Sequence, residues 1–324
     1  MNCAIIGAGQ LGRRHLQGLL TCYNAKLNIF ILDPSSESLA VAELRAKEIE
    51  HSHELFFTNT IHDLPKDLEF VVIATNSKVR LNAMETLFQH ARVRNLILEK
   101  ILFPVLEQYT QALELVHHHQ VSCWVNHTRR MYEAYHQLKS YFNHNKTYSF
   151  QLVGASWGLA CNGLHFIDLF EFLTDSKLTS ISNSLLDGQP IESKRSGYVE
   201  FDGTLTGTLD HKHHFSITSC RSQTPIAPTL CIMTDDVRIV IQESGTPKVY
   251  LFKKENRFNL EEETFQVLYQ SQLTGILFEQ IQTSGTCALP PFDHASSTHQ
   301  IFLASILNRW NEVTKSSNIL LPIT

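Results

Sequence analysis

The chain has 324 residues, of which 43% are hydrophobic, and its 27 Lys and Arg against 32 Asp and Glu leave a formal net charge of −5. This length is typical of two domains, and the apolar content is enough for packed cores, so the composition excludes a chain that is disordered throughout. The acidic balance also excludes the basic surface of a nucleic-acid-binding protein.

The sequence further indicates a cytoplasmic protein that does not bind a membrane. Its seven cysteines are odd in number and form no CxxC pair, which argues against a disulfide framework or a zinc knuckle. The first residues, MNCAIIGAGQLG, lack the basic start and the cleavage site of a signal peptide. No apolar run approaches the roughly 20 residues that span a bilayer.

In the first part of the chain, apolar strands alternate with helices. Strands are predicted at residues 2–6, 27–33, 55–58, 69–75, 95–100 and 121–126. Helices are predicted at residues 10–20, 36–49, 78–90 and 106–119. This alternation is typical of a doubly wound parallel sheet, so we predict an α/β protein with a Rossmann domain over residues 1–122.

After residue 122 the pattern changes. Helices are predicted at residues 129–141, 163–173, 261–284 and 294–312, with a strand in YSFQLVGASWG. Between residues 179 and 253, alternating apolar and polar stretches are punctuated by Gly, Pro, Asn and Asp, which is typical of an antiparallel meander. We therefore predict an α+β domain over residues 123–324 with an open, mostly antiparallel sheet.

Three glycines, Gly7, Gly9 and Gly12, form the sequence GAGQLG between the first strand and the first helix. The first glycine allows a tight turn, the second lets the backbone approach a pyrophosphate, and the third lets helix and strand pack closely. A GxGxxG motif alone is weak evidence for a dinucleotide site. Here Asp33 also ends the second strand, close to the position roughly 20 residues after the glycines at which an acidic residue binds the ribose. The pattern predicts a dinucleotide site.

The acid also bears on the choice of cofactor. The carboxylate of Asp33 would accept hydrogen bonds from a ribose 2′-hydroxyl and repel a 2′-phosphate, which favours NAD over NADP. NADP stays open, because Ser35, Ser36, Arg13 and Arg14 would tolerate a phosphate.

Two further segments carry polar residues suited to chemistry. Glu99 and Lys100 end the fifth strand, at the sheet edge where open α/β sheets bind ligands. His165 and Asp168 are three residues apart on a predicted helix and so share a face.

With these residues the chain resembles the Gfo/Idh/MocA oxidoreductases, the superfamily of glucose–fructose oxidoreductase and inositol dehydrogenase. The resemblance rests on the motifs GAGQLGRRHL, VVIATNSKVRLNAMETL, LILEK, NHTRRM and GLHFIDL. It implies hydride transfer between nicotinamide and a hydroxyl or ketone of a sugar, a sugar acid or a nucleotide-linked sugar. It also implies a homodimer or homotetramer, formed through the open sheet.

The resemblance assigns roles to individual residues. Lys100 would contact the reacting hydroxyl, His165 would act as the general acid/base, and Asp168 would orient His165 or serve structure alone. The cofactor-binding residues would be Gly7, Gly9, Gln10, Leu11, Gly12, Asp33, Thr75, Asn76, Glu99 and Lys100. The substrate-binding residues would be Lys100, Asn126, Arg129, Asn162 and His165.

The chain departs from the family pattern at two positions. Ile101 stands where proline usually follows the lysine, and Cys161 stands four residues before His165, where many members have an aspartate. With Asn162, the motif reads Asn-Gly-x-His, and this variant of the family motif is associated with pathways that make sugars for surface polysaccharides. These departures leave the Lys100 and His165 pair intact but weaken any assignment of an inositol-like substrate.

Other functions stay open. Relatives in this superfamily include a dinucleotide-binding regulator without catalytic activity and a glycosidase that uses NAD as a transient oxidant. A metal enzyme is disfavoured: His211 and His213 would share a strand face, but they lack a carboxylate or cysteine partner at ligand spacing. We therefore expect no metal site.

Overall fold

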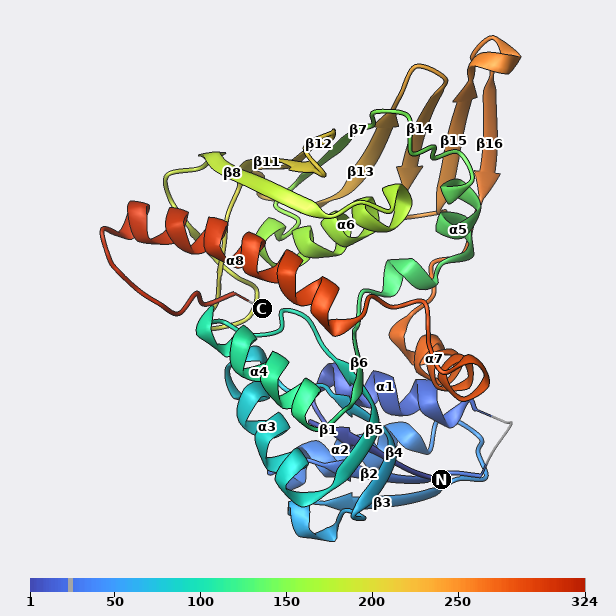
Figure 1. Cartoon of the computed structure of the whole chain (residues 1–324), viewed down its shortest axis with the longest axis vertical. Coiled ribbons are helices and arrows are strands. Elements are labelled where there is room, and N and C mark those ends of the chain that lie inside the picture. The colour runs from blue at the N-terminus through green and yellow to red at the C-terminus, as the bar shows by residue number, and fades with distance from the viewer. Residues whose placement is uncertain (23–25, 324) are drawn as a thin grey trace. The chain divides into compact units, whose positions relative to one another are not determined.

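The computed structural model describes residues 1–22 and 26–323 of the chain (Figure 1). Packing divides the chain into two compact units: Met1–Met131 with Leu268–Ser296, and Tyr132–Val267 with Ser297–Thr324. A domain boundary between residues 122 and 123 stays a prediction. Within the described residues, no helix has both the length and the hydropathy needed to cross a bilayer.

The first unit contains a six-stranded sheet in which all neighbouring strands are parallel. Its strands are β1 (Asn2–Ile6), β2 (Asn28–Leu32), β3 (Glu54–Thr58), β4 (Asp67–Ile73), β5 (Arg92–Leu98) and β6 (Ser122–Val125). The order β3-β2-β1-β4-β5-β6 confirms the predicted Rossmann sheet. The strand order reverses between β1 and β4, which is where such sheets bind dinucleotides.

Five helices belong to the first unit. They are α1 (Gln10–Leu20), α2 (Ser36–Ala46), α3 (Ser77–His90), α4 (Glu107–His118) and α7 (Gln270–Ser284), with the short turn η1 (Ile61–Asp63) between β3 and β4. One buried cluster joins Leu16 of α1, Leu39 of α2 and Phe278 of α7 to the strand residues Ile5 and Phe70. These three helices therefore share one core against the parallel sheet.

Glycines bring α1 and α7 unusually close together. A Cβ on Gly18 would lie 2.9 Å from the carbonyl oxygen of Gln270, and a Cβ on Gly275 would lie 2.6 Å from the carbonyl oxygen of Gly18. A larger residue at either position would push the helices apart. This contact joins residues about 255 positions apart, and it places the first turn of α7 beside α1.

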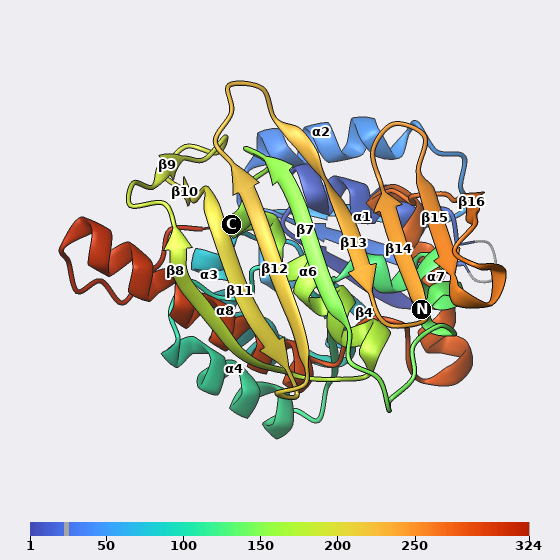
Figure 2. The same cartoon turned by 90° about the horizontal axis from the view of Figure 1, so that it is seen from above.

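The second unit contains an eight-stranded sheet, seen from above in Figure 2. Its strands are β7 (Ser149–Ala155), β8 (Leu178–Leu186), β11 (Gly203–Leu209), β12 (His213–Cys220), β13 (Ile226–Met233), β14 (Val237–Gln242), β15 (Lys248–Lys253) and β16 (Leu260–Thr264). The order is β16-β15-β14-β13-β7-β12-β11-β8, and only the β7–β12 pair is parallel. The predicted mostly antiparallel sheet is confirmed.

The remaining elements of the second unit are one mostly buried helix that packs against the sheet and several short segments. They are α5 (Glu133–Lys139), α6 (Leu159–Thr174), the two-residue strands β9 (Ile191–Glu192) and β10 (Val199–Glu200), and η3 (Lys254–Asn256). Phe170 of α6 stacks on Phe150 of β7 at 4.5 Å and packs against Phe215 of β12. The helix α8 (Phe292–Thr314) closes the chain and supplies Phe302, which touches Gly163.

Two predicted helices were wrong in part. Residues 261–264 form the strand β16, because Glu262 pairs with Lys248 and Glu261 pairs with Lys253 across the strands. The helix predicted over 129–141 is broken into η2 (Thr128–Met131) and α5, because Tyr132 between them is extended and buried.

Candidate functional site

The glycine loop has the geometry of a phosphate-binding turn. Gly7 has a φ of +100°, and a Cβ on Gly12 would lie 1.8 Å from the carbonyl oxygen of Gly7, so both positions require glycine. Gly9 is different, because no atom lies within 4 Å of the place where its Cβ would be. Gly9 is therefore free of packing constraints and leaves room for a ligand at the start of α1, where Gln10 and Leu11 follow.

Asp33 lies directly after β2 and is bound to the glycine loop. Its carboxylate accepts hydrogen bonds from the backbone N–H of Ala8 at 2.7 Å and of Ser35 at 2.9 Å. Each oxygen retains a second lone pair for a ligand hydroxyl. The aspartate also lines a pocket of about 380 Å³ with Gly7 and Thr75, and the described lining residues include no Lys or Arg.

The segment after β4 contributes Thr75 and Asn76. Thr75 lines the same pocket, and its hydroxyl is buried without a hydrogen-bond partner among the described residues. The Asn76 side chain instead caps α3, accepting a hydrogen bond from the N–H of Lys78 at 3.1 Å. The structure thus gives Thr75 an unused polar group and Asn76 a structural partner.

Arg80 braces the loops that follow β4 and β5. It is 2% exposed on α3, and its guanidinium donates to the carbonyl oxygens of Thr75, Ile101 and Leu102, the last at 2.8 Å. The fixed fork of an arginine suits three acceptors on two loops. This role of Arg80 was not predicted from the sequence, although its i, i+4 and i+7 spacing with buried Met84 and Leu87 is typical of a residue in the interior.

Glu99 lies in a buried polar network. Its Oε1 accepts from His15 Nε2 at 2.8 Å and from Asn126 Nδ2 at 2.6 Å. Burial alone would raise the pKa of Glu99, but the hydrogen bonds from His15 and Asn126 outweigh it and hold the pKa below its usual value. Glu99 is therefore ionised, and its carboxylate braces its surroundings.

Two side chains of α7 complete this network. Gln270 Oε1 accepts from Asn126 Nδ2 at 2.7 Å, while its Nε2 lies 3.2 Å from His15 Nδ1. Thr274 Oγ1 lies 3.0 Å from the same His15 nitrogen. An imidazole with its proton on Nε2 satisfies all these contacts. No role of His15, Gln270 or Thr274 was predicted from the sequence.

Lys100 follows Glu99 in a cationic neighbourhood of the first unit. His127 is buried, and its burial together with the nearby charges of Arg130 and Lys100 holds its pKa well below the usual value. Arg129 contributes positive charge to the same surroundings. Ile101, at the family's proline position, is buried, and the peptide bond before it is cis. His127 therefore lies among three cations and the carboxylate of Glu99, and its burial favours the neutral imidazole.

In the second unit, α6 carries Asn162, His165 and Asp168. The amide of Asn162 donates to the carbonyl oxygens of Trp157 at 3.0 Å and Gly158 at 3.1 Å, which closes the turn before the helix. His165 is partly exposed, and Asp168, one turn further on, is buried. Asn162 therefore has a structural contact in addition to its expected role toward substrate.

A carboxylate from the strand β10 caps the N-terminus of α6. Glu200 of β10 accepts from the N–H groups of Ala160 at 2.8 Å and Cys161 at 3.1 Å. A negative charge is favourable at a helix N-terminus. This contact explains why α6 begins at Leu159, four residues before the predicted start. Cys161, at the family's aspartate position, lies within this capped turn.

The structure groups the predicted residues by unit. The glycine loop, Asp33, Thr75, Asn76, Glu99, Lys100, Asn126 and Arg129 all lie in the first unit, at the carboxyl ends of the parallel strands or at helix starts beside them. Asn162, His165 and Asp168 lie together on α6 of the second unit.

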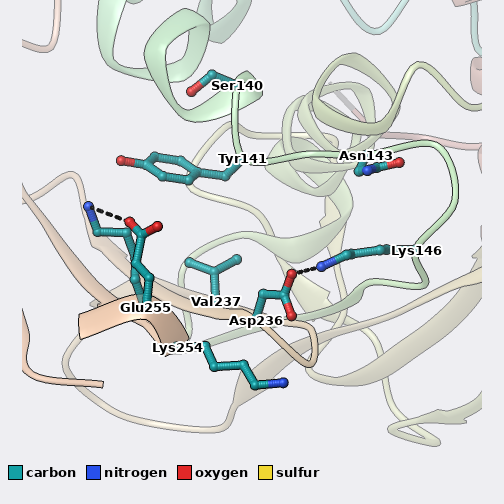
Figure 3. A pocket seen from close by; sticks show the side chains of 9 residues that line it. Ser140, Tyr141, Asn143, Lys146, Asp236, Val237, Lys254 and Glu255 are labelled. Atoms are coloured by element: carbon teal, nitrogen blue, oxygen red, sulfur yellow. Dashed lines mark ion pairs between the residues drawn. The ribbon is translucent and has the colours of Figure 1, made fainter. Parts of the chain in front are cut away.

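The second unit also has a larger pocket of about 550 Å³, shown in Figure 3. Tyr141 and Val237 face it, while Lys146 pairs with Asp236 and Lys253 pairs with Glu255 at 3.8 Å. Because these opposite charges compensate one another, the pocket offers a weaker candidate site than the glycine loop.

Histidine and carboxylate groups do not gather around a metal in the described part of the chain, where no three His, Cys, Asp or Glu side chains form a suitable group. The expectation that His211 shares a strand face with His213 was wrong. His211 lies in the turn before β12 with a φ of +54°, and His213 Nδ1 accepts from the N–H of Tyr148.

Comparison with known proteins places these features in context. The family model GFO_IDH_MocA, described as an oxidoreductase family with an NAD-binding Rossmann fold, matches residues 1–127. No curated protein matches the chain.

Solved structures match nearly the whole chain in fold. A UDP-N-acetylglucosamine 3-dehydrogenase from Acidithiobacillus ferrooxidans has a TM-score of 0.65 at 14% identity, with 96% of this chain and 97% of that chain covered. An oxidoreductase from Agrobacterium radiobacter, solved with NAD⁺, L-tartaric acid and magnesium, has a TM-score of 0.70 at 13% identity, covering 96% and 97%. The transcriptional regulator Gal80p from Kluyveromyces lactis has a TM-score of 0.69 at 14% identity, covering 96% and 92%. At these identities the likeness shows a shared fold.

Proposed function

We propose that this chain is an NAD-dependent dehydrogenase or reductase acting on a hydroxyl or ketone of a sugar derivative, and the match of residues 1–127 to the NAD-binding oxidoreductase family model supports this. The observation that carries the proposal is the glycine loop with Asp33 bound to it. Gly9 leaves open space for a pyrophosphate, and Asp33 lines a pocket together with Thr75, whose buried hydroxyl has no partner among the described residues.

The same geometry supports NAD as the cofactor. A 2′-phosphate beside Asp33 would meet a carboxylate, and the described residues lining this pocket include no cation to compensate it. Arg14 donates one hydrogen bond to Gln17 at 2.8 Å, three residues further along α1. When bound, NAD supplies the hydride acceptor of the reaction.

The remaining chemistry belongs to side chains of this chain. A carbinol carbon gives up a hydride only as its hydroxyl loses a proton, so a base must take that proton. We assign this role to His165, because histidine titrates near neutral pH. Lys100 would stabilise the charge that develops on the oxygen. Asp168, one turn from His165 on α6, would orient the imidazole.

The charges near Lys100 favour an anionic substrate. Lys100, Arg129 and Arg130 all contribute positive charge around His127. A sugar acid or a nucleotide-linked sugar would bring a carboxylate or phosphate to these cations, whereas a neutral sugar would not. Asn126 and Asn162 would add hydrogen bonds to hydroxyl groups. The dehydrogenase from Acidithiobacillus ferrooxidans named above acts on such a nucleotide-linked sugar.

A regulator without catalytic activity is the alternative that a specific observation favours, since Gal80p shares the fold. The presence of both Lys100 and His165 favours the enzyme. A glycosidase that uses NAD transiently would differ from both by releasing an aglycone without net NADH.

The experiment that tests the proposal is a screen with purified protein and NAD over sugar acids and nucleotide-linked sugars, followed at the NADH absorbance band. We expect absorbance to rise with a member of these anionic classes. NAD binding without turnover on any substrate would favour the regulator, and absence of NAD binding would overturn both.

A further inference from the structure

The orientation of the Asn126 side-chain amide is determined by its neighbours. Its Nδ2 donates to Glu99 Oε1 at 2.6 Å and to Gln270 Oε1 at 2.7 Å. With the amide turned over, its oxygen would face the ionised Glu99 with no proton between them, which is strongly unfavourable. Both protons of the NH₂ group are therefore used, and the oxygen points away from these two acceptors.

That oxygen lacks a partner. Asn126 is 3% exposed, and within the described part of the chain its Oδ1 is buried without a hydrogen-bond donor. A buried amide oxygen without a donor costs free energy, and such groups are rare in folded proteins. The arrangement of Glu99 and Gln270 thus holds one acceptor ready for a donor that the chain does not provide.

The position of Asn126 in the sheet indicates which ligand brings the donor. Asn126 directly follows β6, and its N–H donates to the carbonyl oxygen of Leu98 at the end of β5. In a doubly wound sheet, the two halves bind the two mononucleotides of the dinucleotide. The half formed by β1, β2 and β3 carries Asp33, so the half formed by β4, β5 and β6 faces the nicotinamide nucleotide.

We propose that Asn126 Oδ1 accepts a hydrogen bond from the carboxamide NH₂ of the nicotinamide, and that Glu99 and Gln270 are positioning residues that hold the amide in this orientation. The inference rests on the proposed function, and it moves Asn126 from substrate binding to cofactor binding. The carboxamide is the donor group on the reacting ring of the cofactor, so this contact would fix the ring's orientation.

The network is built to keep this orientation. Glu99 is ionised and receives His15 as a second donor, so it accepts from Asn126 with the strength of a charged acceptor. Gln270 is itself held, because its Nε2 donates to Thr274 Oγ1 at 3.1 Å. Among the fully buried side-chain polar atoms of this network in the described chain, Asn126 Oδ1 is the one without a hydrogen-bond partner.

The test compares two cofactors in a binding assay and needs no substrate. The probe pair is NAD and 3-acetylpyridine adenine dinucleotide, in which a methyl group replaces the NH₂ of the carboxamide. We expect the unmodified protein to bind NAD roughly three- to tenfold more tightly, the range of one neutral hydrogen bond. In Asn126→Leu this preference is expected to fall to about onefold, because the acceptor is gone.

Two further variants complete the design. Gln270→Met leaves Asn126 in place but removes one of the two acceptors that orient it, so the preference should fall part of the way. If circular dichroism shows that Asn126→Leu does not fold, Gln270→Met alone still tests the inference. Asn95→Leu is the matched control, because the Asn95 amide on β5 donates to Glu69 and not to this network; its preference should equal that of the unmodified protein.

The outcomes are distinct. A preference for NAD that survives in both Asn126→Leu and Gln270→Met would overturn the inference, and so would equal binding of the two cofactors by the unmodified protein. Either result would mean that a water molecule or a substrate hydroxyl meets the oxygen, while NAD binding would leave the proposed function standing. Absence of any NAD binding would overturn the proposed function as well.

Discussion

His15 Nε2 lies 2.8 Å from Glu99 Oε1, and this buried contact joins the first helix after the glycine loop to the end of β5 beside Lys100. The two residues are 84 positions apart in the chain. This hydrogen bond connects the helix that follows the proposed pyrophosphate-binding loop to Glu99, the neighbour in the chain of Lys100, which is proposed to contact the substrate. The contact has a consequence for stability that depends on pH.

Substitution of Glu99 by Gln should remove a pH-dependent part of the free energy of unfolding. The pKa of Glu99 is lower in the folded protein than in the unfolded chain, where it is about 4.3. Ionised Glu99 therefore stabilises the folded protein above this pH, and the stabilisation is lost as the pH falls through the lower folded-state pKa. We expect Glu99→Gln to cost roughly 1–3 kcal/mol at pH 7 and less at pH 4. Urea unfolding at both pH values measures this; an equal cost at both would contradict it.

The glycines of the loop should differ sharply in their tolerance of alanine. Gly12→Ala would place a Cβ 1.8 Å from the carbonyl oxygen of Gly7, so we expect a loss of about 3 kcal/mol or more in stability. Gly9→Ala meets open space and should leave the thermal midpoint unchanged, while weakening NAD binding by blocking the pyrophosphate. Thermal unfolding and calorimetric titration separate the two effects. A destabilised Gly9→Ala protein would contradict this account of the loop.

Asp33 should set the preference between NAD and NADP. Replacing it by Ser keeps an acceptor for the N–H of Ala8 but removes the charge that repels a 2′-phosphate. We expect the ratio of the two dissociation constants to shift toward NADP by about tenfold or more, mostly through weaker binding of NAD. Titration of both cofactors measures the ratio. An unchanged ratio would show that another residue selects the cofactor.

Lys100 and His165 should be needed for turnover but not for cofactor binding. Loss of a general base costs roughly 100- to 10,000-fold in rate, so we expect His165→Ala to fall in that range, and Lys100→Ala to fall similarly. Both should bind NAD normally. His214→Ala and Lys254→Ala, exposed residues away from both motifs, serve as controls and should retain activity. Normal turnover in the Lys100 and His165 variants would overturn the assignment.

The open face of the eight-stranded sheet should form contacts between copies of the chain. Val153 of β7 is 50% exposed and Met233 of β13 is 45% exposed, and the register of these paired strands puts both on one face of the sheet, which we expect a second copy to cover. We expect a homodimer or homotetramer, with Val153→Glu shifting it toward monomer. Sedimentation at micromolar concentration tests this, with Leu44→Glu on α2 as a control. A monomeric unmodified protein would contradict the prediction.

Much of the fold was predictable because its signals are local. The alternation of apolar strands with helices up to residue 122 reflects periodicities within each segment. The glycine loop is recognised by its spacing together with the strand before it, the helix after it and Asp33 at the end of the second strand. The positions of Asp33 and of Glu99 with Lys100 followed from strand ends. Residue identities also marked a resemblance to the family, and the model of its NAD-binding Rossmann domain matches residues 1–127.

Tertiary structure alone decided the features that depend on distant partners. The Glu-rich segment at 261–264 has the composition of a helix, but cross-strand lysines make it a strand. The start of α6 depends on Glu200, about 40 residues later, because helix N–H groups need an acceptor that local sequence does not reveal.

The hydrogen-bond network beside the candidate site also depends on residues that are distant in the sequence. Gly18 and Gly275 allow α1 and α7 to touch, and only this contact brings Gln270 to His15 and Asn126. Hydrogen bonds between side chains require a precise meeting in space, which composition and periodicity cannot specify. The sequence therefore determined where the chemical groups stand along the chain, and the packing of helices that are distant in sequence decided which of them hold one another in place.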